Sequence, residues 1–451
     1  MEILYILLVI LVVTRVCGEL ALRVGQPALV GEILGGVLLG VVVHRFEDRF
    51  PVLSTLSSNE VFIGITDLGV FFLMLLAGLE MQPKELAKAS ARAFVVALGG
   101  FFLPLAAGFG LGWAFLPDSE WRTAQALFIG TALAITAIPV AVKVLHDMRL
   151  MRTRVGKIII SAALFDDVLG LFLLAVLTAL LQTGEFPSLS GFAVLIGRIL
   201  LFFGLTTAAG LFILPFLARR FKRLYLEELE FSMLLVVSLL FSAIAEVLGL
   251  HFILGAFLVG LFFTRRTLEP KVYHEVTGKV TAVSNGFLAP VFFASIGMHL
   301  DLSALIQIPS FVVLFVAVAV LAKFLGAGLA ARSVGLRNAE AAGVGVAMSA
   351  RGALELIIAN IALRAGLFDQ PAPPPPVLQY LFSAVVIMAI ATTLIMPIGL
   401  HLLLGKRPDP APKYARRFPR LQWGRASAPH RERGDVSTPR AWAPSSLRFA
   451  S

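Results

Sequence analysis

Long apolar segments separated by short polar loops make up the chain as far as Leu404. A helix needs about 20 predominantly apolar residues to cross a bilayer, and the pattern predicts thirteen such helices. We expect these helices at residues 3–21, 25–44, 58–80, 92–115, 122–145, 155–181, 189–217, 228–249, 250–264, 280–300, 309–331, 339–363 and 377–404. The pattern therefore predicts an all-α polytopic membrane protein whose transmembrane domain covers residues 1–404.

Composition and charge agree with this prediction and add an orientation. The chain is 58% hydrophobic and only 15% charged, which is outside the usual range of soluble globular proteins. If the N-terminus is outside, the inward-facing loops carry nineteen Lys and Arg residues and the outward-facing loops carry four, namely Arg45, Arg49, Arg122 and Arg364. Because cytoplasmic loops are enriched in basic residues, we expect a multi-pass protein of the cell inner (plasma) membrane with a cytoplasmic C-terminus.

Residues 405–451 differ abruptly from the rest of the chain. They hold eleven Lys and Arg residues against three Asp and Glu, are rich in Pro and Ser, and show no apolar period. This composition predicts a disordered basic cytoplasmic tail. The tail acts either as an orientation signal or as a contact for anionic lipid head groups. The basic surplus of the chain thus has a membrane explanation, and we expect no nucleic-acid partner.

Two pairs of segments resemble each other at a constant offset. Residues 70–80 share a Val-Phe-Phe, a later Gly and Leu and a final acidic residue with residues 291–301, and residues 30–36 share a glycine spacing with residues 254–260. Each pair is separated by seven predicted helices. Because seven is odd, the two copies enter the membrane in opposite directions. The chain is therefore predicted to hold two inverted six-helix repeats on either side of a linking seventh helix, a plan found in many secondary transporters.

The fifth and twelfth predicted helices are also seven apart and both contain helix-breaking features. Pro139 removes a backbone donor in the fifth helix, which frees carbonyl groups near Thr136. A hydroxyl beside free carbonyls suits an alkali cation, although a simple proline kink would leave the same sequence pattern. Such interrupted helices cross at the ion sites of transporters.

The twelfth predicted helix contains an unusually polar run, Ser349-Ala350-Arg351-Gly352, within an apolar segment. Arg351 and Glu355 are four residues apart and can form an ion pair on one helix face. We expect Ser349, Arg351 and Gly352 to belong to the second crossing helix, with the Arg351–Glu355 pair in a structural role.

Asp166 and Asp167 are adjacent carboxylates near the centre of the sixth predicted helix. A carboxylate at this depth costs about 2.5–3.5 kcal/mol on insertion scales, and intramembrane acids usually mark functional sites. The alternative is that buried partners neutralise the pair and hold helices together. Lys323, about midway along the eleventh helix, needs such a partner. We expect one aspartate to pair with Lys323 and the other to exchange protons and cations.

Four groups of residues resemble the second family of bacterial monovalent cation:proton antiporters, the Kef and Nap group. They are residues 26–36 with Leu39-Gly40, residues 76–80, residues 290–293 with 296–298, and Arg351-Gly352 followed by Glu355-Leu356. The motifs occur in the family's order, and the resemblance covers about residues 5–400.

The resemblance implies a homodimer in which a mobile six-helix core moves like an elevator. It implies that Asp167 carries the proton and is the transient ligand of the alkali cation, that Asp166 partners Lys323, and that Thr136 belongs to the crossover site. An Asp-Asp pair with a Lys resembles the electrogenic sodium-type members. No cofactor is implied.

The predicted function is an antiporter that exchanges protons for a monovalent cation, Na+ first, with Li+ and K+ as alternatives. A K+/H+ antiporter of the potassium-efflux type is the second hypothesis, and a cation channel is the third. A channel of the potassium type needs a filter sequence such as TVGYG, which the chain lacks. An enzyme needs a nucleophile with a base or a metal cluster, whereas the chain has one Cys and its few His residues within the predicted membrane domain lie mostly near helix ends.

Overall fold

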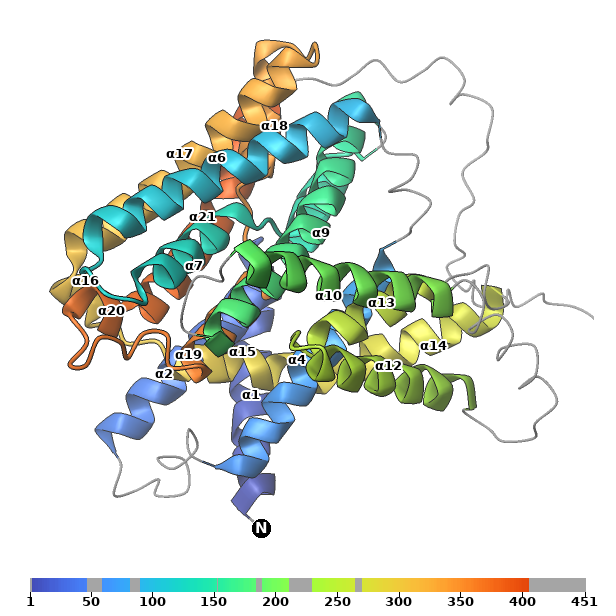
Figure 1. The fold of residues 1–451 in the computed structure, drawn as a ribbon, viewed down its shortest axis with the longest axis vertical. Helices are drawn as coiled ribbons and strands as arrows, with labels where there is room; N and C mark the ends of the chain where they lie inside the picture. The colour runs from blue at the N-terminus through green and yellow to red at the C-terminus, as the bar shows by residue number, and fades with distance from the viewer. Residues whose placement is uncertain are drawn as a thin grey trace, which may run out of the picture. The chain divides into compact units, whose positions relative to one another are not determined.

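The protein is described here by a computed structural model, which places residues 2–46, 59–81, 90–151, 153–183, 189–210, 229–263 and 270–404. These residues fold into helices joined by short links (Figure 1). The helices of the first half are α1 (Glu2–Arg23), α2 (Ala28–Arg45), α4 (Glu60–Glu80), α6 (Ala91–Phe115), α7 (Arg122–Ala134), α8 (Ile138–Asp147) and α9 (Arg154–Thr183).

The remaining helices follow a linking helix, α10 (Leu189–Ala208). They are α12 (Leu229–Val247), α13 (Ile253–Phe262), α14 (Pro270–Val283), the π-helical turn η4 (Ser284–Leu288), α15 (Ala289–Met298), α16 (Ala304–Gln307), α17 (Pro309–Ser333), α18 (Asn338–Ala347), α19 (Ala353–Arg364), α20 (Pro376–Gln379) and α21 (Leu381–Leu404). Every one of the thirteen predicted spans contains at least one helix. Among the described residues, nine helices are long and apolar enough to cross a membrane.

The structure moves some predicted boundaries. The apolar pattern predicts the tenth span at residues 280–300, but its helix begins at Pro270, because the charged residues of α14 conceal an amphipathic extension. The eighth and ninth spans are separated by a turn in which Gly249 has a φ of 76°, a conformation that glycine adopts without strain. Residues 211–217 of the seventh span lie outside the described residues, as do the predicted tail 405–451 and its division from the transmembrane domain.

In the fold, each of the similar segments packs against a segment of the other pair. Helix α2 packs against α15, and α4 packs against α13. Glycines allow these close approaches: a Cβ at Gly36 would lie 2.3 Å from the Ala294 carbonyl oxygen, and one at Gly297 would lie 2.2 Å from that of Ile33. The first helix of one repeat thus packs against the second helix of the other repeat, and the reverse also holds. Two inverted repeats related by a two-fold axis pack in this way.

The α4–α13 contact gives a direct test of this packing. A Cβ at Gly78 would lie 2.1 Å from the Phe257 carbonyl oxygen, so Gly78→Ala must push two helices apart. Overpacking of this kind costs about 1–3 kcal/mol, and we expect a lower melting temperature in detergent. Gly64→Ala on the same helix is the matched control, because nothing lies within 4 Å of its Cβ position. Equal melting temperatures for the two variants would contradict the close approach of α4 and α13.

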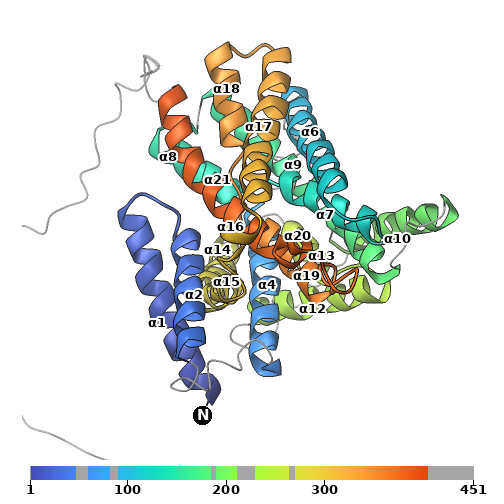
Figure 2. The ribbon, with the colours of Figure 1, turned by 90° about the vertical axis from the view of Figure 1, so that its left-hand side faces the viewer.

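The helices form two groups. The crossover bundle consists of α6, α7, α8, α9, α17, α18, α19 and α21, in which α6 packs along α17 and against α7 (Figures 1 and 2). The flanking bundle consists of α1, α2, α4, α12, α13, α14 and α15. Helix α10 contacts α9 of the first group and α12 and α13 of the second. Each group contains three spans from each half of the chain, as the predicted repeat requires.

Candidate functional site

Two helices of the crossover bundle are interrupted, and their breaks lie against each other. Helix α7 ends at Ala134 and α8 begins at Ile138, while α18 ends at Ala347 and α19 begins at Ala353. The Ala137 backbone N–H donates to the Ala350 carbonyl across 2.8 Å. The Thr136 hydroxyl donates to the Met348 carbonyl across 3.0 Å. The breaks therefore bring four helix ends together, where backbone groups lack partners within their own helices.

The residues predicted for the crossing helices lie at these breaks in different roles. Pro139 lies in the first turn of α8, where proline is well tolerated, so the fifth span is a broken helix rather than a kinked one. A Cβ at Gly352 would lie 2.6 Å from the Cβ of Ala137, so this close approach requires glycine. Ser349 is buried, and its hydroxyl donates to the Val346 carbonyl of the preceding turn across 2.6 Å.

Arg351 joins the two interrupted helices. Its guanidinium donates to the Leu133 carbonyl across 2.7 Å and also to the Ile135 carbonyl, both at the C-terminal end of α7. A cation stabilises this end of a helix, because the exposed carbonyls carry partial negative charge. The Nε atom lies 3.7 Å from Oε2 of Glu355, and both side chains are fully buried. The Arg351–Glu355 pair therefore exists, and Arg351 also holds α7 in place.

Asp166 and Lys323 form a buried ion pair between α9 and α17. Their Oδ2 and Nζ atoms are 2.8 Å apart, and neither side chain is exposed. Lys323 thus has the carboxylate neighbour that its depth in the helix requires. The second oxygen of Asp166, Oδ1, is buried without a hydrogen-bond partner among the residues that the structure describes.

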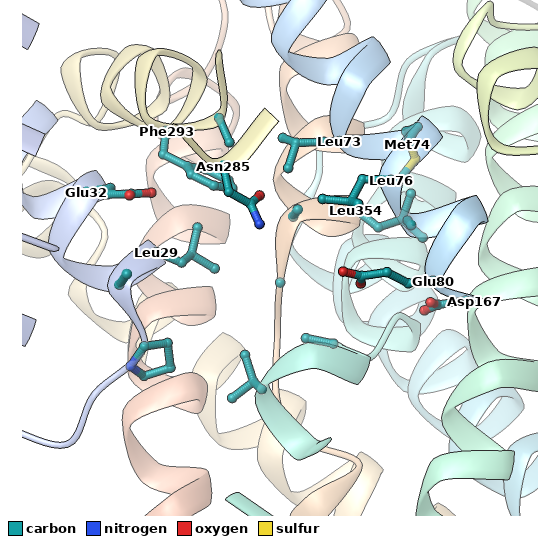
Figure 3. A pocket seen from close by; sticks show the side chains of 18 of the residues that line it. Leu29, Glu32, Leu73, Met74, Leu76, Glu80, Asp167, Asn285, Phe293 and Leu354 are labelled. Carbon is teal, nitrogen blue, oxygen red and sulfur yellow. The ribbon is translucent and has the colours of Figure 1, made fainter. Parts of the chain in front are cut away.

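Asp167 has a different environment from Asp166. It is partly exposed and lines a cavity of about 520 Å³, together with Ile135, Thr136 and Ala137 of the α7–α8 break and Gly352. Figure 3 shows its carboxylate at the edge of this cavity. Of the two adjacent carboxylates, one is paired with Lys323 and the other faces open space beside the crossing point.

The flanking bundle also lines this cavity and contributes further charges. Glu32 of α2, Glu80 of α4 and Arg15 of α1 all line it, and Figure 3 shows the Glu32 and Glu80 side chains at the cavity. Arg15 Nη1 lies 3.5 Å from Glu32 Oε1. In the sequence, Glu32 and Glu80 stood out only as members of motifs. The available signal was that Glu32 is a carboxylate inside a predicted span, which calls for a partner or a function.

Interrupted helices that cross beside buried acids, in a chain with many apolar spans, define a secondary transporter for small ions. Comparison with known proteins identifies the family. Residues 6–406 match the family described as "Sodium/hydrogen exchanger, transmembrane". The chain belongs to this family. It is a multi-pass membrane protein and a monovalent cation/proton antiporter, not an enzyme.

Individual relatives agree with this assignment. The chain is 31% identical to the Na(+)/H(+)-K(+) antiporter GerN of Bacillus cereus, over 88% of this chain and 95% of GerN. It is also 31% identical to the Na(+)/H(+) antiporter of Enterococcus hirae, over 90% of this chain and 99% of that protein. The sodium proton antiporter MjNhaP1 from Methanocaldococcus jannaschii shares the fold, with a TM-score of 0.66, 19% identity, and coverage of 90% and 99% of the two chains.

Proposed function

We propose that this antiporter exchanges protons for Na+ at Asp167. The observation that carries the proposal is the contrast between the two carboxylates: Asp166 is paired with Lys323, whereas Asp167 is open to the cavity. A free carboxylate binds either a proton or a cation, so one site serves both substrates. The names of GerN and of the Enterococcus hirae protein both include Na(+)/H(+) antiport.

Thr136 and the backbone around it complete the proposed cation site. The Thr136 hydroxyl lies in the α7–α8 break and lines the same cavity as Asp167. Alkali cations prefer oxygen ligands, and the hydroxyl oxygen keeps lone pairs although its proton is donated to Met348. Li+ and K+ use the same kind of ligands, and K+/H+ exchange is the second candidate because the name of GerN includes K(+).

Transport is proposed to occur by movement of the crossover bundle past the flanking bundle. Asp167 and Thr136 belong to the crossover bundle, whereas Glu32 and Glu80, which line the same cavity, belong to the flanking bundle. A cavity at this boundary permits one bundle to slide while the site stays intact. Continued exchange after the two bundles have been covalently cross-linked would contradict this movement.

Orientation and assembly are part of the same proposal. The basic residues of the loops support an external N-terminus and a cytoplasmic C-terminus in the inner membrane. The resemblance to the Kef and Nap group supports a homodimer. A C-terminal tag that is accessible from the outside of intact cells would contradict the orientation, and a monomeric mass in native membranes would contradict the dimer.

Competition between protons and cations tests the proposed function. In proteoliposomes with an imposed pH gradient, Na+, Li+ and K+ are compared at several pH values. Because a proton displaces the cation from Asp167, the apparent cation affinity should weaken about tenfold for each pH unit below the pKa of the site. Activity should be bell-shaped with pH, since alkaline solution removes the counter-substrate.

Two outcomes of this experiment would change the proposal. An apparent affinity that stays constant from acid to alkaline pH would exclude a shared site. A larger response to K+ than to Na+ would assign the chain to K+/H+ exchange. Solid-supported-membrane recordings add the charge balance, because exchange of more protons than cations generates a current, as the Asp-Asp pair with Lys323 leads us to expect.

A further inference from the structure

A second cavity, of about 890 Å³, lies at the N-terminal ends of α6 and α9. It shares no lining residue with the cavity at Asp167. Three of its lining residues are cationic, namely Arg92 of α6 and Arg154 and Lys157 of α9, and all three are exposed. None of its lining residues within the described ranges is acidic.

These three cations lie at helix N-termini, where a positive charge is unfavourable. Arg92 lies in the first turn of α6, and Arg154 and Lys157 lie at the start of α9. The N-terminus of a helix carries partial positive charge, so cations there are unfavourable and anions are favourable. Neither first turn contains an acidic residue. Two helix N-termini and three cations therefore converge on this cavity. Arg154 interacts electrostatically with Glu340 of α18, which does not line the cavity, and none of the described lining residues is acidic.

The remainder of the cavity is mostly apolar. Met151 of the preceding link, and Ile158, Ile160 and Leu164 of α9, line it together with the cations. With a rise of about 1.5 Å per residue, Leu164 lies about 10 Å further along α9 than Lys157. Near this cavity, the rings of Phe94 of α6 and Phe165 of α9 are in contact, with their centroids 5.2 Å apart. The cavity is thus cationic at one end and apolar along α9.

We propose that this cavity binds an anionic phospholipid of the bilayer, with its phosphate at Arg92 and Lys157 and an acyl chain along Ile158 to Leu164. An inorganic anion would leave the apolar part of the cavity without a partner, whereas a lipid fills both parts. Basic pockets between membrane helices bind acidic head groups in this way. Since α9 also carries Asp166 and Asp167, a lipid bound here holds the helix that bears the proposed ion site.

The test compares lipids and variants of the full-length protein in detergent. Phosphatidylglycerol should raise the melting temperature more than phosphatidylcholine does. Arg92→Ala/Lys157→Ala should weaken the apparent affinity for phosphatidylglycerol by about fivefold for each cation removed. Arg154 is left intact, because its guanidinium also approaches Gly335. Lys271→Ala is the matched control, since Lys271 is exposed on α14 and does not line the cavity.

Two further variants keep the test decisive. Arg92→Lys/Lys157→Arg should retain the response to phosphatidylglycerol, because both charges remain. Ser161→Phe fills the cavity without changing charge and should abolish the response, which covers the case in which the double alanine variant fails to fold. An unchanged response in Ser161→Phe, or inorganic phosphate that reproduces the effect of phosphatidylglycerol, would overturn the proposal. None of these readouts depends on which cation the protein transports.

Discussion

Asp167→Asn should reduce cation-dependent proton flux in proteoliposomes to the level of empty vesicles. The amide has nearly the shape of the carboxylate but cannot release or take up a proton, and it carries no charge to hold a cation. Asp167 is only partly buried and forms no ion pair with the residues that the structure describes, whereas Asp166 is fully buried against Lys323. Loss of exchange should therefore come with an unchanged fold, measured as a melting temperature close to that of the parent protein.

Glu246→Gln is the matched control for this experiment. Glu246 is an exposed carboxylate on α12, in the flanking bundle and away from the cavity lining. This variant should exchange cations normally. Such a result would show that exchange depends on Asp167 itself and not on every carboxylate in a membrane helix. Near-normal flux from Asp167→Asn would show that another group carries the ion.

Lys323→Ala is expected to give the largest loss of stability. Removing one member of a buried ion pair leaves an uncompensated charge and typically costs about 3–5 kcal/mol. Lys323 Nζ lies 2.8 Å from Asp166 Oδ2, and the other oxygen of Asp166 already lacks a hydrogen-bond partner within the described part of the chain. The melting temperature in detergent should fall, and the pH profile of exchange should shift, because a positive charge near Asp167 has been removed.

The pH dependence of stability tests the same variant further. Without Lys323, Asp166 becomes neutral only by binding a proton, so the stability lost should be smallest in acid and should increase as the pH rises. Lys323→Met/Asp166→Asn removes both charges and should recover part of the melting temperature, as a double-mutant cycle measures. If the single variant melts and titrates like the parent protein, the ion pair contributes nothing to the protein.

The helices and the inverted repeat were predictable because their signals are local. Apolar length identifies a span without knowledge of its neighbours, and every predicted span contains a helix. One boundary was predicted wrongly: the charged residues of α14 made residues 270–279 resemble a loop, so the predicted tenth span began at residue 280. The glycines of the repeat were recognised as a spacing, and the structure adds that they permit α2 to approach α15 and α4 to approach α13.

The interrupted helices were predicted in part. Pro139 drew attention to the correct segment, but the break lies at Ile135–Ala137, and Pro139 belongs to the next helix. The hydrogen bonds from Arg351 to Leu133 and Ile135 were not predictable, because these residues are more than 200 positions apart in the chain. From the sequence, Glu355 was the only near partner of Arg351.

Three properties of this protein follow from its residues alone: it crosses the membrane many times, carries two adjacent acids within one helix, and buries a lysine that requires one of them. How these acids differ depends on packing between helices. Neighbouring residues on a helix point about 100° apart, so the two adjacent aspartates must have different surroundings. The sequence does not say which aspartate faces the lysine and which faces the cavity. The packing of α9 against its neighbours turns Asp166 toward Lys323 and Asp167 toward the cavity. Glu32 and Glu80 line the same cavity, and they come from helices that only the fold brings to it.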